Sequence, residues 1–158
     1  MQDKKITIAP FTPEHFHALA LREEDRADFA GIDETELFAV WADGATYLRD
    51  GQPFLIYGGT LLDGVATVWL VGSAACDSLP LFICKEARRR ITWLFEEGGV
   101  HRVESYCHRN NTRSLYWLIR QVGFKVEGLM RKSGPNKQDR YLLAMTDDDF
   151  KGGAIWAG

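Results

Sequence analysis

The sequence has few cysteines, and none of them lies in a metal-binding pattern. The 158 residues include only Cys76, Cys84 and Cys107, and no Cys-x-x-Cys pair occurs. An odd number of isolated cysteines argues against a disulfide framework and is typical of reduced thiols that pack as small apolar side chains. We therefore expect neither a structural disulfide nor a bound metal.

Excess positive charge and long apolar runs are also absent. The 19 Lys and Arg residues and 22 Asp and Glu residues are well mixed and give a net charge of -3, which argues against nucleic acid as a partner. No segment approaches the roughly 20 apolar residues that span a bilayer. The N-terminal MQDKKITIAP lacks the apolar core of a signal peptide. We expect a cytoplasmic protein whose partner is a small molecule or another protein.

Several common catalytic signatures are missing as well, namely a Ser-His-Asp array, a phosphate loop of the form G-x-x-x-x-G-K and metal-ligand spacing. What is present is enough apolar sequence, 46% of the residues, for one hydrophobic core. We expect a single domain over residues 1–146. A flexible tail should follow over residues 147–158, because this segment begins with three aspartates and ends in the Gly-rich KGGAIWAG.

The first third of the chain predicts one strand and two helices. Residues 4–11 read as a strand, and Thr12 with Pro13 is typical of a helix start. The acidic run 23–28 is expected to be a solvated loop. Asp33 should cap a second helix that ends at Gly44.

The middle of the chain is β-like. Asp50-Gly51 lies between two apolar segments and predicts a two-residue hairpin. Residues 65–71, VATVWLV, contain almost no polar side chain and predict a strand that is buried on both faces at the centre of a sheet. A helix is expected to begin near Ser78, capped by its hydroxyl, with Leu81 among its inward-facing residues.

The most informative stretch is 101–128, HRVESYCHRNNTRSLYWLIRQVGFKVEG. Residues 102–108 alternate as a strand does, with Glu104 and His108 on one face. Asn111 can cap a following helix, whose apolar stripe repeats at helical spacing until Gly123. An extended pattern then resumes over residues 124–130. The stretch therefore predicts strand, capped helix and strand.

These residues, in the form V-E-x-x-x-x-x-x-N-x-x-S, an amphipathic helix and G-F-x-x-E-G, resemble the C-terminal half of the GNAT superfamily of acyl-CoA-dependent N-acyltransferases. The closing R-K-x-G-x-x-x-x-D-x-Y-L-L-A-M resembles the branch that acetylates ribosomal proteins. Over residues 45–146, the resemblance implies an α/β (α+β) fold. Its mixed central sheet would have about six to seven strands, splayed between the fourth and fifth, with about four helices.

The resemblance also implies acetyl-CoA as co-substrate and direct attack of a primary amine on its thioester in a ternary complex. The pantetheine arm would lie beside the fourth strand, where the cofactor-binding candidates are Trp69, Leu70, Val71 and Gly72. For Trp69, a role in the core explains the side chain equally well. Arg88 and Arg89 are candidates for the adenosine phosphates, although a solvated helix face explains them too. The family's phosphate loop, Q/R-x-x-G-x-G/A, has no counterpart here, because no glycine occurs between Gly72 and Gly98.

Three side chains are catalytic candidates under this resemblance. Glu104 would accept the proton of the amine through water, with His108 as a rival. Tyr116 or Ser114 would protonate the leaving thiolate, since the family's usual Tyr position is Ile119 here. Asn111 is a further cofactor-binding candidate, and a plain helix cap explains it as well.

A second function remains open from the sequence. Because it lacks these glycines and this Tyr, the sequence also resembles phage-encoded GNAT-like proteins, some of which are virion components. The protein would then be a catalytically degenerate phage or prophage structural or interaction module. The amine acceptor, small molecule or protein, is not specified by the sequence, which is also compatible with a homodimer.

Overall fold

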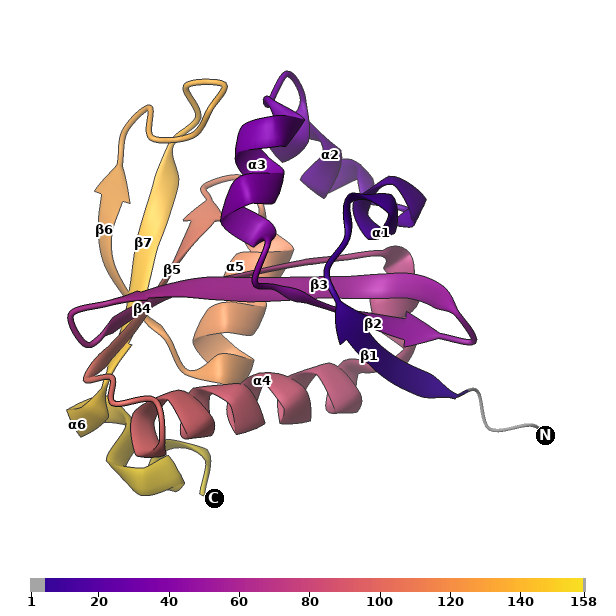
Figure 1. Cartoon of the computed structure of the whole chain (residues 1–158). Helices are drawn as coiled ribbons and strands as arrows, with labels where there is room; N and C mark the ends of the chain where they lie inside the picture. The colour runs from indigo at the N-terminus through magenta and orange to yellow at the C-terminus, as the bar shows by residue number, and fades with distance from the viewer. Residues whose placement is uncertain (1–4, 158) are drawn as a thin grey trace. The chain divides into compact units, whose positions relative to one another are not determined.

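The computed structural model describes residues 5–157 and shows a mixed α/β fold (Figure 1). Its seven strands form one sheet in the order β1-β2-β3-β4-β5-β7-β6. β4 pairs with β5 in parallel, while the β1/β2, β2/β3, β5/β7 and β6/β7 pairs are antiparallel. The strands are β1 (Ile6–Pro10), β2 (Ala45–Arg49), β3 (Gln52–Leu62), β4 (Val65–Gly72), β5 (Arg102–His108), β6 (Lys125–Met130) and β7 (Arg140–Thr146). The expected mixed α/β sheet of six to seven strands is thus confirmed.

Six α-helices accompany these strands in the described part of the chain. They are α1 (Pro13–Ala18), α2 (Glu23–Phe29), α3 (Glu34–Trp41), α4 (Pro80–Glu96), α5 (Thr112–Trp117) and α6 (Asp147–Phe150). Three further short helices are η1 (Ala74–Ser78), η2 (Leu118–Val122) and η3 (Lys151–Trp156).

The chain divides into two compact units. The first holds the described residues up to Gly59 together with Trp69–Pro80, and the second holds Thr60–Val68 and the described residues from Leu81 onward. The prediction of a single domain over residues 1–146 stays a prediction, and each unit is described by itself below.

The first unit has an aromatic core. Rings from α1 and α3 meet edge to face, as when Phe16 lies 5.5 Å from Trp41, while Trp41 stacks on Trp69 with centroids 4.3 Å apart. Such contacts add to the hydrophobic burial of each ring. The buried members of this cluster are Phe11, Phe16, Leu19, Trp41, Ile56 and Val71.

Local sequence signals explain most turns and caps in this unit. Asp50 and Gly51 have φ values of 52° and 81°, which is the backbone that a two-residue hairpin requires. The carboxylate of Asp33 accepts a hydrogen bond from the Thr35 amide at 2.8 Å and so caps α3. The loop expected at the acidic run was wrong, because Glu23–Phe29 forms α2 and Phe29 packs against the aromatic cluster.

The prediction for the fourth strand was right in position and only partly right in burial. Ala66 and Val71 of β4 are 2% and 5% exposed, but Leu70 is 44% exposed. The strand is therefore not covered along its whole length.

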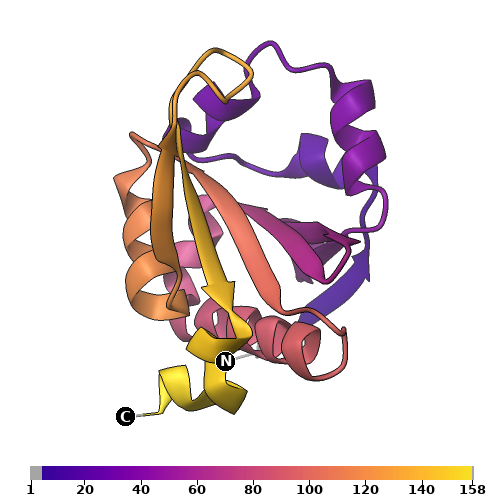
Figure 2. The same cartoon turned by 90° about the vertical axis from the view of Figure 1, so that its left-hand side faces the viewer.

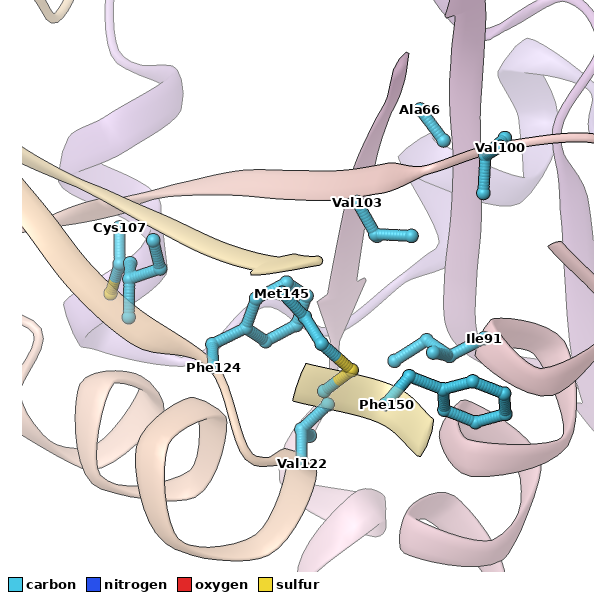
Figure 3. Packing of buried hydrophobic residues seen from close by; sticks show 10 residues of the cluster. Ala66, Ile91, Val100, Val103, Cys107, Val122, Phe124, Met145 and Phe150 are labelled. Atoms are coloured by element: carbon cyan, nitrogen blue, oxygen red, sulfur yellow. The ribbon is translucent and has the colours of Figure 1, made fainter. Parts of the chain in front are cut away.

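The second unit has its own core beneath α4 and α5. Val103 of β5 and Met145 of β7 are fully buried, and residues of both helices pack against the same cluster. Figure 3 shows Met145, Phe124, Phe150 and Ile91 among the residues of this core. Helices α4 and α5 therefore lie on one face of β5 and β7 (Figure 2).

The stretch 101–128 folds as predicted, with one addition. Asn111 caps α5 by accepting a hydrogen bond from the Ser114 amide at 3.2 Å, and Gly123 ends the helical region with φ of 97°. The last turn, η2, is a π-helix, a widened turn that is frequent at functional sites.

The helix after β4 begins differently from the prediction. Ser78 does not cap it, since the Ser78 hydroxyl donates to the Ala75 carbonyl at 2.9 Å within η1. α4 starts at Pro80, and Leu81, which was expected to face inward, is 85% exposed. The helix thus begins two residues later than predicted, and Leu81 lies in its exposed first turn, while Ile91, Leu94 and Phe95 further along α4 pack on the core as expected.

Helices occupy the C-terminal segment for which the sequence predicts a flexible tail. Residues 147–156 form α6 and η3, and Phe150 is only 3% exposed in the core of the second unit. The Trp156 indole N–H also donates to the Val122 carbonyl at 2.8 Å. Two aromatic side chains thus hold a segment whose composition alone is typical of disorder.

Candidate functional site

The two faces of β5 have different characters. Val103, Ser105 and Cys107 are buried on the face covered by α4 and α5, and the Ser105 hydroxyl donates to the Val68 carbonyl of β4 at 2.9 Å. Because side chains alternate along a strand, Glu104 and Tyr106 lie on the opposite face. We refer to that face as the outer face, and it carries the polar groups of the second unit.

Glu104 is the centre of a polar network on the outer face. Its Oε2 accepts from the Arg102 guanidinium at 2.9 Å, and its Oε1 accepts from the Thr67 hydroxyl at 3.3 Å. The Tyr106 hydroxyl lies 3.5 Å from the same Oε1. The carboxylate is therefore fixed in position by three neighbouring side chains, two from β5 and one from β4.

A second carboxylate shares the same cation. Arg102 binds Glu127 through both of its terminal nitrogens, at 2.9 and 2.7 Å. The hydrogen bonds to Glu127 and then to Glu104 raise the pKa of Arg102, and the hydrogen bond from Arg102 lowers the pKa of Glu127. The network is thus one cation between two anions, with one negative charge in excess.

Tyr106 and Arg140 form the next part of the outer face. The Arg140 guanidinium lies over the Tyr106 ring, 5.0 Å from its centroid, as cations do over aromatic faces. The Arg140 guanidinium also donates two hydrogen bonds to Ser133, from Nε to the hydroxyl oxygen at 3.0 Å and from Nη2 to the carbonyl oxygen at 2.7 Å. The guanidinium orientation is therefore set by the β6–β7 loop.

His108 ends the same row of side chains. Its Nδ1 accepts a hydrogen bond from the Asn110 amide at 3.2 Å. A neutral imidazole with Nδ1 as acceptor carries its proton on Nε2. The Nδ1 atom of His108 is thus engaged by its own loop, and its role as a rival of Glu104 stays a prediction.

The two candidates for protonating the thiolate lie on α5. Tyr116 is 64% exposed, and Ser114 is half-buried in the first turn beside the buried Asn111. Since α5 packs on the face of β5 that carries Val103 and Cys107, the structure does not bring Tyr116 into the network of Glu104. Asn111 has the capping role that the sequence allowed.

The two arginines suggested for the adenosine phosphates have protein partners. Arg88 donates to the Gln121 carbonyl from Nε at 3.2 Å and from Nη2 at 2.8 Å. Arg89 pairs with Glu86 on the same helix at 2.7 Å. Both contacts are structural, and the phosphate role stays a prediction.

The remaining cofactor candidates belong to the first unit. The Trp69 indole stacks on Trp41 and covers Gly58, where a Cβ atom would lie 2.4 Å from the ring. Val71 and Gly72 are buried, and Leu70 is the exposed member of the group. The core role of Trp69 is therefore present, while the backbone of Leu70 stays a candidate for ligand contact.

The connection after β4 has a compact structure. The Ser73 hydroxyl and carbonyl oxygens accept from the Ala75 and Cys76 amides at 3.2 and 3.0 Å. Two guanidinium groups adjoin this turn, since Arg22 pairs with Asp77 and Arg49 donates to the Ser78 hydroxyl at 2.9 Å. The charge of Arg22 is balanced by Asp77, and the Arg49 guanidinium lies beside the turn where the glycines of a phosphate loop are missing.

Sequence reasoning missed Arg102 and Arg140 as parts of the outer face. The alternation of residues 102–108 could have placed Arg102 and Tyr106 beside Glu104. No sequence signal predicts Arg140, because its position depends on the antiparallel register of β5 with β7, in which Arg140 is opposite His108.

Within residues 5–157, no group of three or more His, Cys, Asp or Glu side chains could hold a metal ion. Nor does any helix in that range combine the length and the apolar character of a membrane span.

Solved structures that superpose on this chain include several acetyltransferases. A GNAT-family acetyltransferase from Bacillus anthracis superposes with a TM-score of 0.67 at 16% identity, over 92% of this chain and 98% of that one. RimJ from Mycobacterium smegmatis, in complex with CoA-disulfide, gives 0.66 at 15% identity, over 96% and 88%. The aminoglycoside acetyltransferase AAC(6')-Ib, in complex with coenzyme A and kanamycin, gives 0.64 at 14% identity, over 93% and 98%.

No protein-family model and no curated protein sequence matches the chain. The likeness therefore concerns the fold, which is that of GNAT acetyltransferases, and it covers nearly the whole chain.

Proposed function

We propose that this protein transfers an acetyl group from acetyl-CoA to a primary amine, in a ternary complex without a covalent enzyme intermediate. The observation that supports this most is the outer face of β5, where a fixed carboxylate occurs in a fold shared with acetyltransferases that were solved with coenzyme A. Fold likeness alone would not carry the activity.

The chemistry requires little from the protein. The amine nitrogen attacks the thioester carbonyl, a C–N bond forms, the C–S bond breaks, and the amine loses one proton while the thiolate gains one. Glu104 accepts the amine proton through water. The hydrogen bond from Arg102 holds this carboxylate in a fixed orientation for that role.

Backbone N–H groups from Leu70 to Gly72 would polarise the thioester carbonyl. The thiolate leaves with a proton from Tyr116, Ser114 or water. A thiol has a pKa near 8.5, so an acid at this position helps the reaction without being compulsory.

The residues of the first unit fit an anionic co-substrate. Arg22 and Arg49 supply positive charge at the connection after β4. Three amides of this connection, those of Ala75, Cys76 and Leu79, are used within the turn. Fewer backbone donors then remain for a pyrophosphate, so we expect acetyl-CoA to bind weakly.

These hydrogen bonds within the turn also favour the second candidate function. The protein would then be a GNAT-fold interaction module of phage or prophage type that has lost acetyl-transfer activity. Isothermal titration calorimetry with acetyl-CoA separates the two. Heat of binding and a rise in Tm at millimolar acetyl-CoA are expected for the enzyme. No heat and no shift in Tm would overturn the proposal and favour the interaction module.

A further inference from the structure

Arg140 has one side that the protein does not use. Its Nε and Nη2 donate to Ser133, and its plane covers the Tyr106 ring. Among the described residues Nη1 has no partner, and the side chain is half-buried rather than covered. A guanidinium that is already oriented, with a free edge, is a prepared site for a carboxylate or a similar oxyanion.

The place of this free edge relative to Glu104 is defined by the strands. Arg140 is opposite His108 in the β5/β7 register and diagonal to Tyr106, so all of these side chains share the outer face. The phenol of Tyr106 has its hydroxyl beside Glu104 and its ring under Arg140. The proton-accepting carboxylate and the guanidinium are therefore separated by a single phenol ring.

We propose that the acceptor is an α-amino acid or a close analogue, whose carboxylate is bound by Arg140 while its amine is presented toward Glu104. This inference rests on the proposed acetyl transfer and specifies the class of acceptor. An α-amino acid carries both groups that these two residues can bind, an amine for Glu104 through water and a carboxylate for Arg140. A polyamine has no group that would use Arg140.

Ser133 acts as the positioning residue for this contact. Its two oxygens hold Nε and Nη2 and thereby leave Nη1 for the ligand. A lysine at position 140 would keep the charge and lose the fixed planar geometry.

The test compares the proteinogenic α-amino acids with their carboxamides, which keep the amine and lack the negative charge. Thiol release from acetyl-CoA gives kcat/KM for each pair. For the best amino acid, kcat/KM should be at least about tenfold higher than for its own carboxamide, as expected for a charge-assisted hydrogen bond. Arg140→Gln should remove this preference by raising KM for the amino acid while KM for the carboxamide stays unchanged. The preference of Arg140→Lys should lie between those of the wild type and Arg140→Gln.

A structural role for Arg140 predicts a different result. If Arg140→Gln only loosened the β6–β7 loop, acid and amide would slow together, and this outcome would overturn the inference. Arg120→Gln is the matched control, because Arg120 is exposed on η2 and has no partner in the described structure. It removes the same charge and should leave the preference intact.

Failure of the inference is distinguishable from failure of acetyl transfer. If polyamines or carboxamides are acetylated with no preference for amino acids that have a free carboxylate, the assignment of an amino-acid acceptor is refuted and the proposed acetyl transfer is retained. Calorimetry of the best-binding amino acid with the wild type and with Arg140→Gln needs no turnover. If the amino acid binds in an Arg140-dependent manner but is not acetylated, the proposed acetyl transfer is refuted and the carboxylate-binding site is supported. If there is neither binding nor turnover, both proposals are refuted.

Discussion

Arg88 holds the backbone carbonyl of Gln121 with two hydrogen bonds, from Nη2 at 2.8 Å and Nε at 3.2 Å. Carbonyls in the last turn of a helix lack intrahelical donors, so Arg88 satisfies a group that would otherwise depend on water. The same guanidinium lies 5.7 Å from the centroid of Trp156. One side chain of α4 therefore connects η2 with the C-terminal segment.

Replacing this side chain should reduce stability. We expect Arg88→Ala to lower the free energy of unfolding by roughly 1.5–3 kcal/mol, as for hydrogen bonds from a charged donor. Arg89→Ala is the matched control, since Arg89 is exposed and its ion pair with Glu86 is a surface pair, for which about 0–1 kcal/mol is usual. Urea unfolding measures both, and equal losses would contradict the structural role of Arg88.

The phosphate role of Arg88 and Arg89 has its own test. If these residues contact the 3′-phosphate, the double replacement by Ala should weaken CoA binding by at least about tenfold and dephospho-CoA binding much less. If the contacts seen in the structure are their whole role, calorimetry will give equal affinities before and after replacement. Equal losses for both ligands would place the 3′-phosphate elsewhere.

Gly58 should not tolerate a side chain. A Cβ atom there would lie 2.4 Å from the Trp69 ring, which is itself stacked on Trp41 and cannot move freely. We expect Gly58→Ala to cost about 1–3 kcal/mol of stability, the usual range for overpacking. Gly128→Ala is the control, because nothing lies within 4 Å of its Cβ position. Similar urea midpoints for the two variants would refute the close contact.

Tyr116→Phe tests the general acid. If Tyr116 donates the proton to the thiolate, kcat should fall by at least about tenfold, because general acid catalysis contributes about 10²–10⁴-fold, while KM for acetyl-CoA should change little. Ser114→Ala should lower kcat by a smaller factor than Tyr116→Phe. The 64% exposure of Tyr116 makes Phe easy to accommodate, so loss of folding will not confuse the result. Wild-type turnover would remove Tyr116 from the mechanism.

The C-terminal segment should make stability depend on acid pH. Hydrogen bonds from Lys125 and then from the Thr146 amide lower the pKa of Asp149. Folding thus favours the carboxylate, so its contribution is complete above the ordinary Asp pKa of about 3.9 and is lost as pH falls through the lower folded value.

Asp149→Asn should therefore flatten the decline in unfolding free energy below about pH 4. Asp148→Asn is the control, because Asp148 is exposed and its side chain has no partner among the described residues. Thermal melts between acid and neutral pH provide the measurement. An unchanged slope in Asp149→Asn would contradict the ion pair with Lys125.

Local signals in the sequence predicted much of the fold. Gly51 and Gly123 occupy positions with positive φ, and Asn111 supplies a side-chain cap, so the hairpin, the helix end and the cap occur where these residues predict them. The errors arose where tertiary contacts override composition. The tail is ordered because Phe150 and Trp156 find partners distant in sequence.

The candidate site was less predictable than the fold. Alternation along β5 identified Glu104, since it depends only on neighbours in sequence. The order β5-β7-β6 and the position of Arg140 depend on which strands pair and in what register. Composition and periodicity do not carry that information, so the contacts of Glu127 with Arg102 and of Arg140 with Tyr106 could not be predicted from the sequence.

The stacked pair of Trp41 and Trp69 also has an optical consequence. Two indole rings 4.3 Å apart and 13° from parallel couple their electronic transitions and should give an exciton couplet in circular dichroism. Both rings belong to the first unit, whereas Trp93, Trp117 and Trp156 belong to the second. The couplet would therefore report melting of the first unit without any label, and comparison with a melt of the second unit would reveal whether the two lose structure together.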